Sequence, residues 1–167
     1  MNVEATARIL QLTACLSSIS CVTFRSRSGA GSRCGWSGKG QGRVEARCHE
    51  DGSLTFTETG HFQQDALPEP SGISSARPLP FHNVFRWRSH AEHVALSHER
   101  RGVDAAVWLF DLVVAEDERD ADFVSREAHL CGDDRYRATL TFTEDGFDLE
   151  WTIHGPRKDE HLHYRYR

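Results

Sequence analysis

The amino-acid sequence predicts an all-β fold: an antiparallel up-and-down barrel of about eight to nine strands, preceded by a short N-terminal helix. Nine short segments alternate apolar and polar residues, a pattern typical of strands with one buried and one solvated face. Such alternation argues against a parallel sheet, whose strands are apolar on both faces. An antiparallel set of this size usually closes into a barrel because closure removes the exposed edges.

The bulk properties indicate one soluble domain over residues 1–167. A chain of this length can bury a core without disulfides. The net charge of −5 argues against nonspecific nucleic-acid binding. The five cysteines form no CxxC pair and no zinc spacing, so we expect reduced thiols, no metal site and a cytoplasmic location.

The N-terminal segment 2–13 is predicted to be a short amphipathic helix, with Ala5, Ile9 and Leu12 on one side. The residues around Cys15 resemble a lipoprotein cleavage box. However, the apolar run before them is shorter than the roughly 7–15 residues of a signal-peptide core. No run approaches the roughly 18 apolar residues of a membrane helix, so we expect no membrane partner.

The strands follow in order, joined by recognisable turns. They are expected at residues 16–27, 43–48, 53–62, 81–88, 93–101, 105–114, 136–142, 147–153 and 162–166. Asp51-Gly52 and Asp145-Gly146 are typical hairpin turns. Residues 28–42 are rich in Gly and Ser, but Lys39 is not followed by Ser or Thr, as a phosphate-binding loop requires. We therefore interpret them as a long hairpin connection.

Two further segments are predicted to be loops. Residues 63–80 hold four of the five prolines and show no periodicity, which makes them a candidate lid over one end of the barrel. Residues 116–122 form a solvated acidic loop. Gly155-Pro156 sets a tight turn before the last strand.

Five motifs together resemble a known family. They are WSGKG at 36–40, TETG at 57–60, FRW at 85–87, HLCGDDRY at 129–136 and GPRKD at 155–159. At this spacing the chain resembles domain of unknown function 6314 from about residue 34 to 167. The resemblance implies a calycin-like barrel with room for a ligand cavity, and it implies no reaction.

Glu58 is the strongest candidate site residue, because it is in phase with Leu54, Phe56 and Phe62 and should point into the barrel. A buried carboxylate usually has a raised pKa and is costly unless paired. It could anchor a ligand or act as a general acid or base, with Tyr136 as a second catalytic candidate. The alternative is a structural carboxylate held by Arg86.

Other candidates surround the expected lumen. His98 is in phase with the apolar residues of its strand and is either a satisfied core residue or a ligand contact; it could also bind haem, which no motif supports. His129, Cys131 and Asp133 share a face if extended, so His129 could activate a Cys131 thiolate. The alternative is a turn in which Gly132 supplies a positive φ and Asp133 caps backbone amides.

The remaining candidates lie on the last strands and their connections. Arg157 could bind a ligand carboxylate or pair with Asp133, and Lys158 stands beside it. Inward-facing aromatic residues should line the lumen or the core, namely Trp87, Trp151, Tyr164 and Tyr166. The outward set His161, His163, Arg165 and Arg167 is basic, and we interpret it as a solvated face rather than an anion-binding patch.

Three hypotheses of function remain open. The first is a module that binds a small, partly apolar molecule in the lumen. The second is a cofactor-free lyase or isomerase in which Glu58 and a tyrosine transfer a proton, by analogy with other small barrels. The third is a structural barrel whose lumen is packed shut. We expect no cofactor and no nucleic-acid partner, and the oligomeric state is left open.

Overall fold

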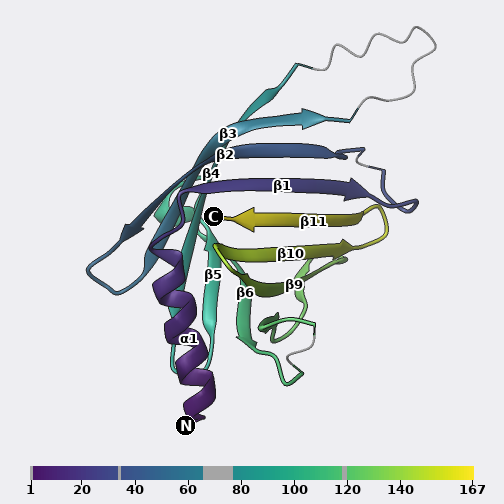
Figure 1. Ribbon diagram of the computed structural model, residues 1–167. Coiled ribbons are helices and arrows are strands. Elements are labelled where there is room, and N and C mark those ends of the chain that lie inside the picture. Colours follow the sequence, from purple (N-terminus) through teal and green to yellow (C-terminus); the bar gives the residue numbers. More distant parts are fainter. Residues whose placement is uncertain (1, 34, 66–76, 118–119) are drawn as a thin grey trace, which may run out of the picture.

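A computed structural model of the chain describes residues 2–33, 35–65, 77–117 and 120–167 (Figure 1). Its elements are α1 (Val3–Leu16), β1 (Cys21–Ser28), β2 (Gly38–Cys48), β3 (Leu54–Gln64), β4 (Leu79–Ser89), β5 (Val94–His98), the 3-10 helix η1 (Val103–Ala105), β6 (Val107–Val114), β7 (Phe123–Ser125), β8 (His129–Cys131), β9 (Asp134–Thr143), β10 (Gly146–His154) and β11 (Asp159–Tyr166). Every strand pairing is antiparallel, as predicted.

The strands close into a barrel. The order β10-β11-β1-β2-β3-β4-β5-β6-β7-β9 returns to β10 through the pairing of β9 with β10, so ten strands form the wall. Among the described strands, β8 pairs only with β9 and lies outside this ring. The prediction of eight to nine strands was therefore wrong: β7 and β8 have three residues each, too few to show a period of two.

The helix α1 covers one end of the barrel, which we call the helix end. Its buried residues Ile9, Leu12 and Leu16 belong to the same core cluster as the side chains inside the barrel. Arg8 bonds to Asp122 at 3.0 Å and Thr13 to Ser89 at 2.8 Å, which ties α1 to two connections at this end. The predicted helix, 2–13, was too short, because Leu16 continues the apolar face one turn beyond Leu12.

Several predicted boundaries differ from the observed ones. The first strand begins at Cys21, not at 16, because α1 continues through Leu16. β2 begins at Gly38, so part of the predicted 28–42 connection is strand; glycines hid its alternation. β5 ends at His98 and β6 begins at Val107, with the 3-10 helix between them. The predicted loop 63–80 was too long at both ends, because β3 continues to Gln64 and β4 begins at Leu79. The lid prediction itself falls mainly on residues 66–76, outside the described residues, as do positions 118–119 of the acidic loop.

Two turns can be compared with their predictions. Gly52 has a φ of 79° at the Asp51-Gly52 turn, as predicted. The second hairpin turns at Glu144 and Asp145, because Gly146 already pairs with Thr143. A side chain at Gly146 would collide with the carbonyl oxygen of Tyr166, so close approach of the last strand explains this glycine.

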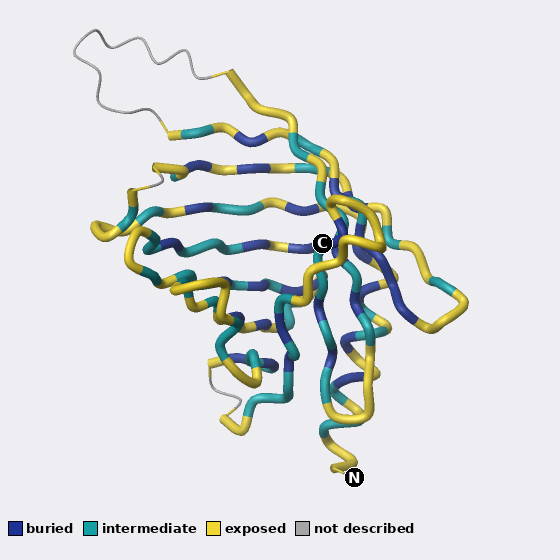
Figure 2. The backbone as a smooth tube through the Cα atoms, turned by 180° about the vertical axis from the view of Figure 1, so that it is seen from behind, coloured by how far each residue is buried: buried dark blue, intermediate teal, exposed yellow. Residues whose placement is uncertain are grey.

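Side chains alternate between the lumen and the outer face, as the banded burial along the strands shows (Figure 2). Two aromatic clusters fill much of the lumen. The helix-end cluster is a closed cycle of Phe56, Trp87, Phe147 and Tyr166, with neighbouring ring centroids 4.9–5.7 Å apart. In the far-end cluster, Trp151 lies 5.4–6.0 Å from Phe110, Tyr164 and Phe85. The opposite, far end of the barrel carries residues 29–33 and 35–37 and the connections 99–106 and 155–158.

Candidate functional site

Glu58 lies on β3 and points into the lumen, as its phase predicted. Its side chain is completely buried, with an exposed fraction of 0%. The hydroxyl of Tyr166, on β11, donates a hydrogen bond of 2.7 Å to Oε1. Nδ2 of Asn83, the partner of Glu58 on β4, lies 3.4 Å from Oε2. The carboxyl group is therefore held by neutral donors inside the barrel.

Burial raises the pKa of Glu58 from its ordinary value of 4.5 to about 7. The hydrogen bonds from Tyr166 and Asn83 lower the pKa, but they do not outweigh the loss of water around the charged form. A carboxyl group with such a pKa can give or take a proton near neutral pH. Glu58 is therefore a titratable group of the lumen whose chemistry suits proton transfer.

The prediction that Arg86 holds Glu58 was wrong. Arg86 lies between the inward-facing Phe85 and Trp87, so the period of two directs it to the outer face. There its guanidinium donates to Glu99 Oε1 at 3.0 Å and to Ser53 Oγ at 2.6 Å. The hydrogen bond to Glu99 raises the pKa of Arg86.

Tyr164 and Tyr166 face the lumen beside Glu58, as predicted. Their rings stack 6.0 Å apart, and Tyr164 also stacks on Phe24 at 5.0 Å. Burial raises the pKa of both hydroxyls, and the negative charge of Glu58 raises them further. Both tyrosines are therefore neutral hydrogen-bonding groups at physiological pH.

The indole groups of Trp87 and Trp151 each leave a buried donor unused. Both Nε1 atoms are buried without a hydrogen-bond partner in the described part of the chain. Such a donor costs about 1–3 kcal/mol, and each case in a native protein calls for an explanation. Trp87 belongs to the helix-end cluster and Trp151 to the far-end cluster.

The far end of the lumen is bordered by side chains that are only half-buried. They are Asn83, His98, Tyr136, Ile153 and Leu162. His98 lies with its ring 5.2 Å from Phe85, at the lumen position its phase predicted. Burial lowers the pKa of His98, and the charge of Arg100 lowers it further, so this ring is neutral at pH 7.

The segment around Cys131 forms a hairpin outside the barrel wall. Cys131 is exposed, and Gly132 has a φ of 63° at the turn between β8 and β9. The ring of His129 lies 5.1 Å from Trp108 and 5.7 Å from Tyr136. The turn interpretation is confirmed for Gly132. The capping role of Asp133 and the activation of Cys131 stay predictions.

The GPRKD segment places a lysine, rather than an arginine, at the far end of the barrel. Lys158 Nζ lies 3.1 Å from Asp134 and 3.4 Å from the hydroxyl of Tyr136. These hydrogen bonds raise the pKa of Lys158 to about 12, and the bond to Asp134 has the larger effect. An ion pair was expected between Arg157 and Asp133. The structure shows it one position further along each segment, between Lys158 and Asp134. Arg157 itself is exposed, and its carbonyl oxygen accepts from Arg33 N at 3.0 Å.

The structure thus brings together part of the predicted site. Glu58, His98, Trp151 and Tyr164 share the lumen with Trp87, whereas Arg86, His129, Cys131 and Asp133 lie elsewhere. Sequence reasoning missed Asn83, although an amide in phase with Phe85 and Trp87 is an inward polar position that the alternation could have revealed.

Comparison with known protein families identifies the family of this chain. The profile of a family of unknown function, DUF6314, matches residues 26–167. The chain belongs to this family. The match covers β2 to β11 and the last residues of β1, and α1 precedes it. Comparison with curated proteins and with solved structures found no match. Membership in DUF6314 supplies no activity. Within the described residues, no helix is long and apolar enough to cross a membrane.

Proposed function

We propose that the far-end half of the lumen binds a small, partly apolar molecule that carries a hydrogen-bond acceptor. The observation that carries this proposal is the unused indole N–H of Trp151, which is buried among the rings of Phe85, Phe110 and Tyr164. A ligand carbonyl or hydroxyl oxygen that accepts this bond would remove the cost of the orphaned donor. The surrounding rings supply the apolar contact surface.

The two ends of the lumen differ in access. At the helix end, Trp87 also has an unused N–H, but its cluster is a closed cycle of rings covered by α1. At the far end, Asn83, His98 and Tyr136 are only half-buried, which supports access from this end. Barrel diameter grows with strand number, and eight strands already leave room for one small ligand in some barrels. The ten-strand wall supports a site at the far end.

The first test is native mass spectrometry of the purified protein, followed by a thermal-shift titration with decanoate, phenylacetate, riboflavin and haem. A ligand present at 100 times its Kd stabilises the folded state by about 2.7 kcal/mol. For a chain of this size that corresponds to a Tm increase of roughly 5–10 °C. We expect a retained small molecule or a concentration-dependent shift with at least one apolar probe.

Two matched variants locate the site. Trp151→Phe removes the far-end donor and keeps an aromatic ring, so it should weaken binding of the responding probe. Trp87→Phe makes the same chemical change at the helix end and should leave binding unchanged. Equal loss in both variants would contradict the far-end site. No response to any probe in the wild-type protein would contradict binding altogether and favour a packed structural barrel.

A second candidate function is a cofactor-free lyase or isomerase, favoured by the Glu58–Tyr166 hydrogen bond of 2.7 Å and the raised pKa of Glu58. Its test uses a molecule recovered by native mass spectrometry, incubated with the protein in deuterated water. Proton transfer at carbon would add deuterium to that molecule with the wild-type protein and not with Glu58→Gln. Binding without isotope exchange would leave the binding module as the function.

A further inference from the structure

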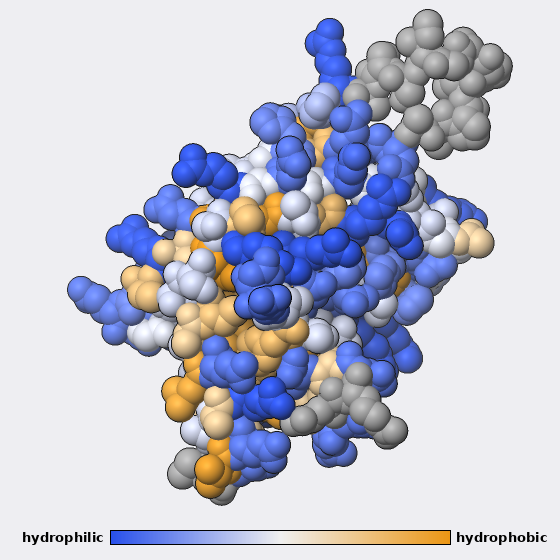
Figure 3. Space-filling view, viewed as in Figure 1, coloured by the Kyte–Doolittle hydropathy of each residue, from blue (hydrophilic) through white to orange (hydrophobic). Residues whose placement is uncertain are grey.

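The outer face of the barrel carries a basic groove that the lumen site does not involve. A cavity of about 630 Å³ lies over β11, β1, β2 and β3. Six of the basic side chains that line it are Arg25, Arg27, Lys39, His161, His163 and Arg165. We call this cavity the outer groove. Hydrophilic side chains gather over these strands on the face that Figure 3 shows.

Strand register places these basic side chains in rows. Arg25 is the direct partner of Lys39 on β2 and of His163 on β11, so three basic residues lie side by side across three strands. Arg27 is the partner of His161 in a second row. Directly opposed like charges destabilise a sheet unless something neutralises them.

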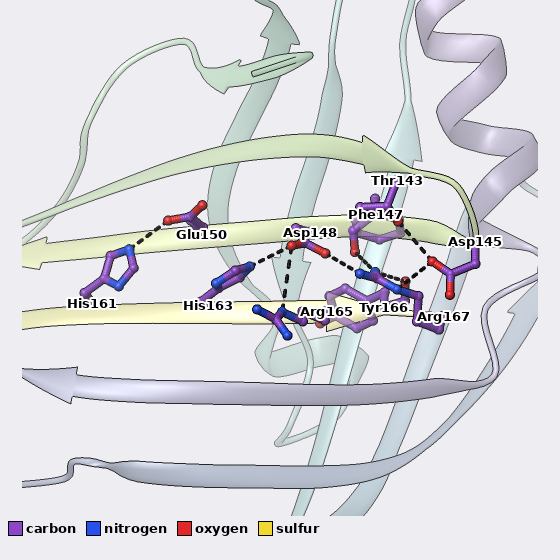
Figure 4. Close-up of polar contacts among 10 residues, drawn as sticks. All are labelled: Thr143, Asp145, Phe147, Asp148, Glu150, His161, His163, Arg165, Tyr166 and Arg167. Atoms are coloured by element: carbon purple, nitrogen blue, oxygen red, sulfur yellow. Dashed lines mark hydrogen bonds and ion pairs between the residues drawn. The ribbon is translucent and has the colours of Figure 1, made fainter. Parts of the chain in front are cut away.

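The protein neutralises only part of this charge. Asp65 bonds to Arg25 at 2.9 Å. Asp148 lies 2.8 Å from His163, and Glu150 lies 2.9 Å from His161 (Figure 4). Arg27 and Lys39 are exposed and form no ion pair within the described ranges of the chain. The Nε atom of Arg25 is buried there without a hydrogen-bond partner. The groove therefore holds two uncompensated cations and one unused buried donor.

We propose that the outer groove binds the phosphate groups of a small phosphorylated molecule of about mononucleotide size. Its volume lies within the roughly 300–1,000 Å³ of small-molecule sites. Arginine and lysine are the usual partners of phosphate oxygens, and the guanidinium can donate two parallel hydrogen bonds. Thr23 and Gln41 also line the groove, and their polar side chains can form further hydrogen bonds to the bound molecule.

The charge around the groove favours a small anion over a nucleic acid strand. Asp65, Asp148 and Glu150 lie at its borders, and a long polyanion that left the groove would meet these carboxylates. The net charge of −5 also opposes an extended polyanion.

The test is isothermal titration calorimetry of the full chain with adenosine triphosphate, pyrophosphate and adenosine. We expect adenosine triphosphate and pyrophosphate to bind and adenosine not to bind. The double variant Arg27→Gln/Lys39→Gln should weaken adenosine triphosphate binding by about tenfold or more, because two charge-assisted bonds to phosphate are lost. Thermal unfolding monitored by circular dichroism confirms that this surface variant is folded.

Two controls make the result specific. Arg43→Gln removes an exposed cation from the same strand, β2, at a position that does not line the groove, and should change affinity less than twofold. Trp151→Phe should leave adenosine triphosphate binding intact, which separates this site from the lumen. Lack of binding by both phosphate probes, an equal loss in Arg43→Gln, or tighter binding of a single-stranded oligonucleotide would overturn the proposal.

Discussion

Glu58 and Asp148 are carboxylates on opposite faces of the same barrel wall, and their surroundings push their pKa values in opposite directions. Inside, burial raises the pKa of Glu58 to about 7, and its partners Tyr166 and Asn83 are neutral. Outside, burial also opposes ionisation of Asp148, but hydrogen bonds from Arg167 and His163 outweigh it and lower the pKa (Figure 4). A carboxylate removed from water thus stays charged when cations reach it, and tends to keep its proton when its partners are neutral donors.

A contrast between buried and exposed positions should also appear in stability, most strongly for tryptophan. Trp87 is buried in the closed helix-end cluster, whereas Trp36 is 53% exposed. We expect Trp87→Ala to reduce the free energy of unfolding by about 3–5 kcal/mol, because it removes the packing of the indole ring against its neighbours and leaves a cavity. Trp36→Ala should change it by about 0.5 kcal/mol or less. Urea unfolding measures both, and similar values would contradict the packed helix end.

Glu58→Gln tests the inner carboxyl through pH. The folded-state pKa of Glu58 is raised above its unfolded value, so its stabilising contribution is complete below pH 4.5 and is lost as pH rises through about 7. Between pH 4.5 and 8.5, wild type should therefore lose roughly 3 kcal/mol more stability than Glu58→Gln. Parallel pH profiles for the two proteins would show that Glu58 is ionised in the barrel.

Asp148→Asn serves as the matched outer variant, and its pH dependence should have the opposite sign. The pKa of Asp148 is lowered, so its contribution is present above the unfolded pKa and is lost as pH falls through the folded one. The cost of Asp148→Asn should be less than about 1 kcal/mol at pH 7, because the pair lies at the surface. The stability difference between wild type and Asp148→Asn should become smaller as the pH falls, because Asp148 then takes up a proton.

The alternation of side chains along each strand made it possible to predict which residues face the lumen. It did not determine which residues of other strands lie next to them. Alternation alone placed Glu58, Tyr164 and Trp151 inside the barrel. It could not show that Tyr166 reaches Glu58, because β11 and β3 are separated by β1 and β2 and meet only through barrel closure. The incorrect pairing with Arg86 arose from residue chemistry considered without strand parity.

The outer groove shows the same limit on the other face. The basic residues of the last strand were visible in the sequence, but their neighbours were not. Only the register of β1 with β2 and β11 sets Lys39 and His163 on either side of Arg25. Short strands set another limit, because β7 and β8 contain too few residues for any pattern.

Tyr166→Phe sharpens the account of Glu58 with a smaller expected effect. The variant keeps the ring in the helix-end cluster and removes the 2.7 Å hydrogen bond. We expect a loss of about 1 kcal/mol at pH 5, where Glu58 is neutral, and about 1.5–3 kcal/mol at pH 8.5, where the donor serves a charged group. The pKa of Glu58 should rise further, which carboxyl NMR titration measures. An unchanged pKa would mean that Tyr166 contributes only packing.

The smallest effect is expected where the outer face is most exposed, at the pair of His161 and Glu150. The two side chains lie 2.9 Å apart and are 42% and 43% exposed, so solvent screens their attraction. His161→Ala should change the free energy of unfolding by about 0.5 kcal/mol or less at pH 7, and 0.5 M salt should remove most of that difference. Urea unfolding at two salt concentrations measures this. A loss well above 1 kcal/mol would mean that the pair of His161 and Glu150 stabilises the pairing of β10 with β11, and His161 would then have a structural role in the outer groove.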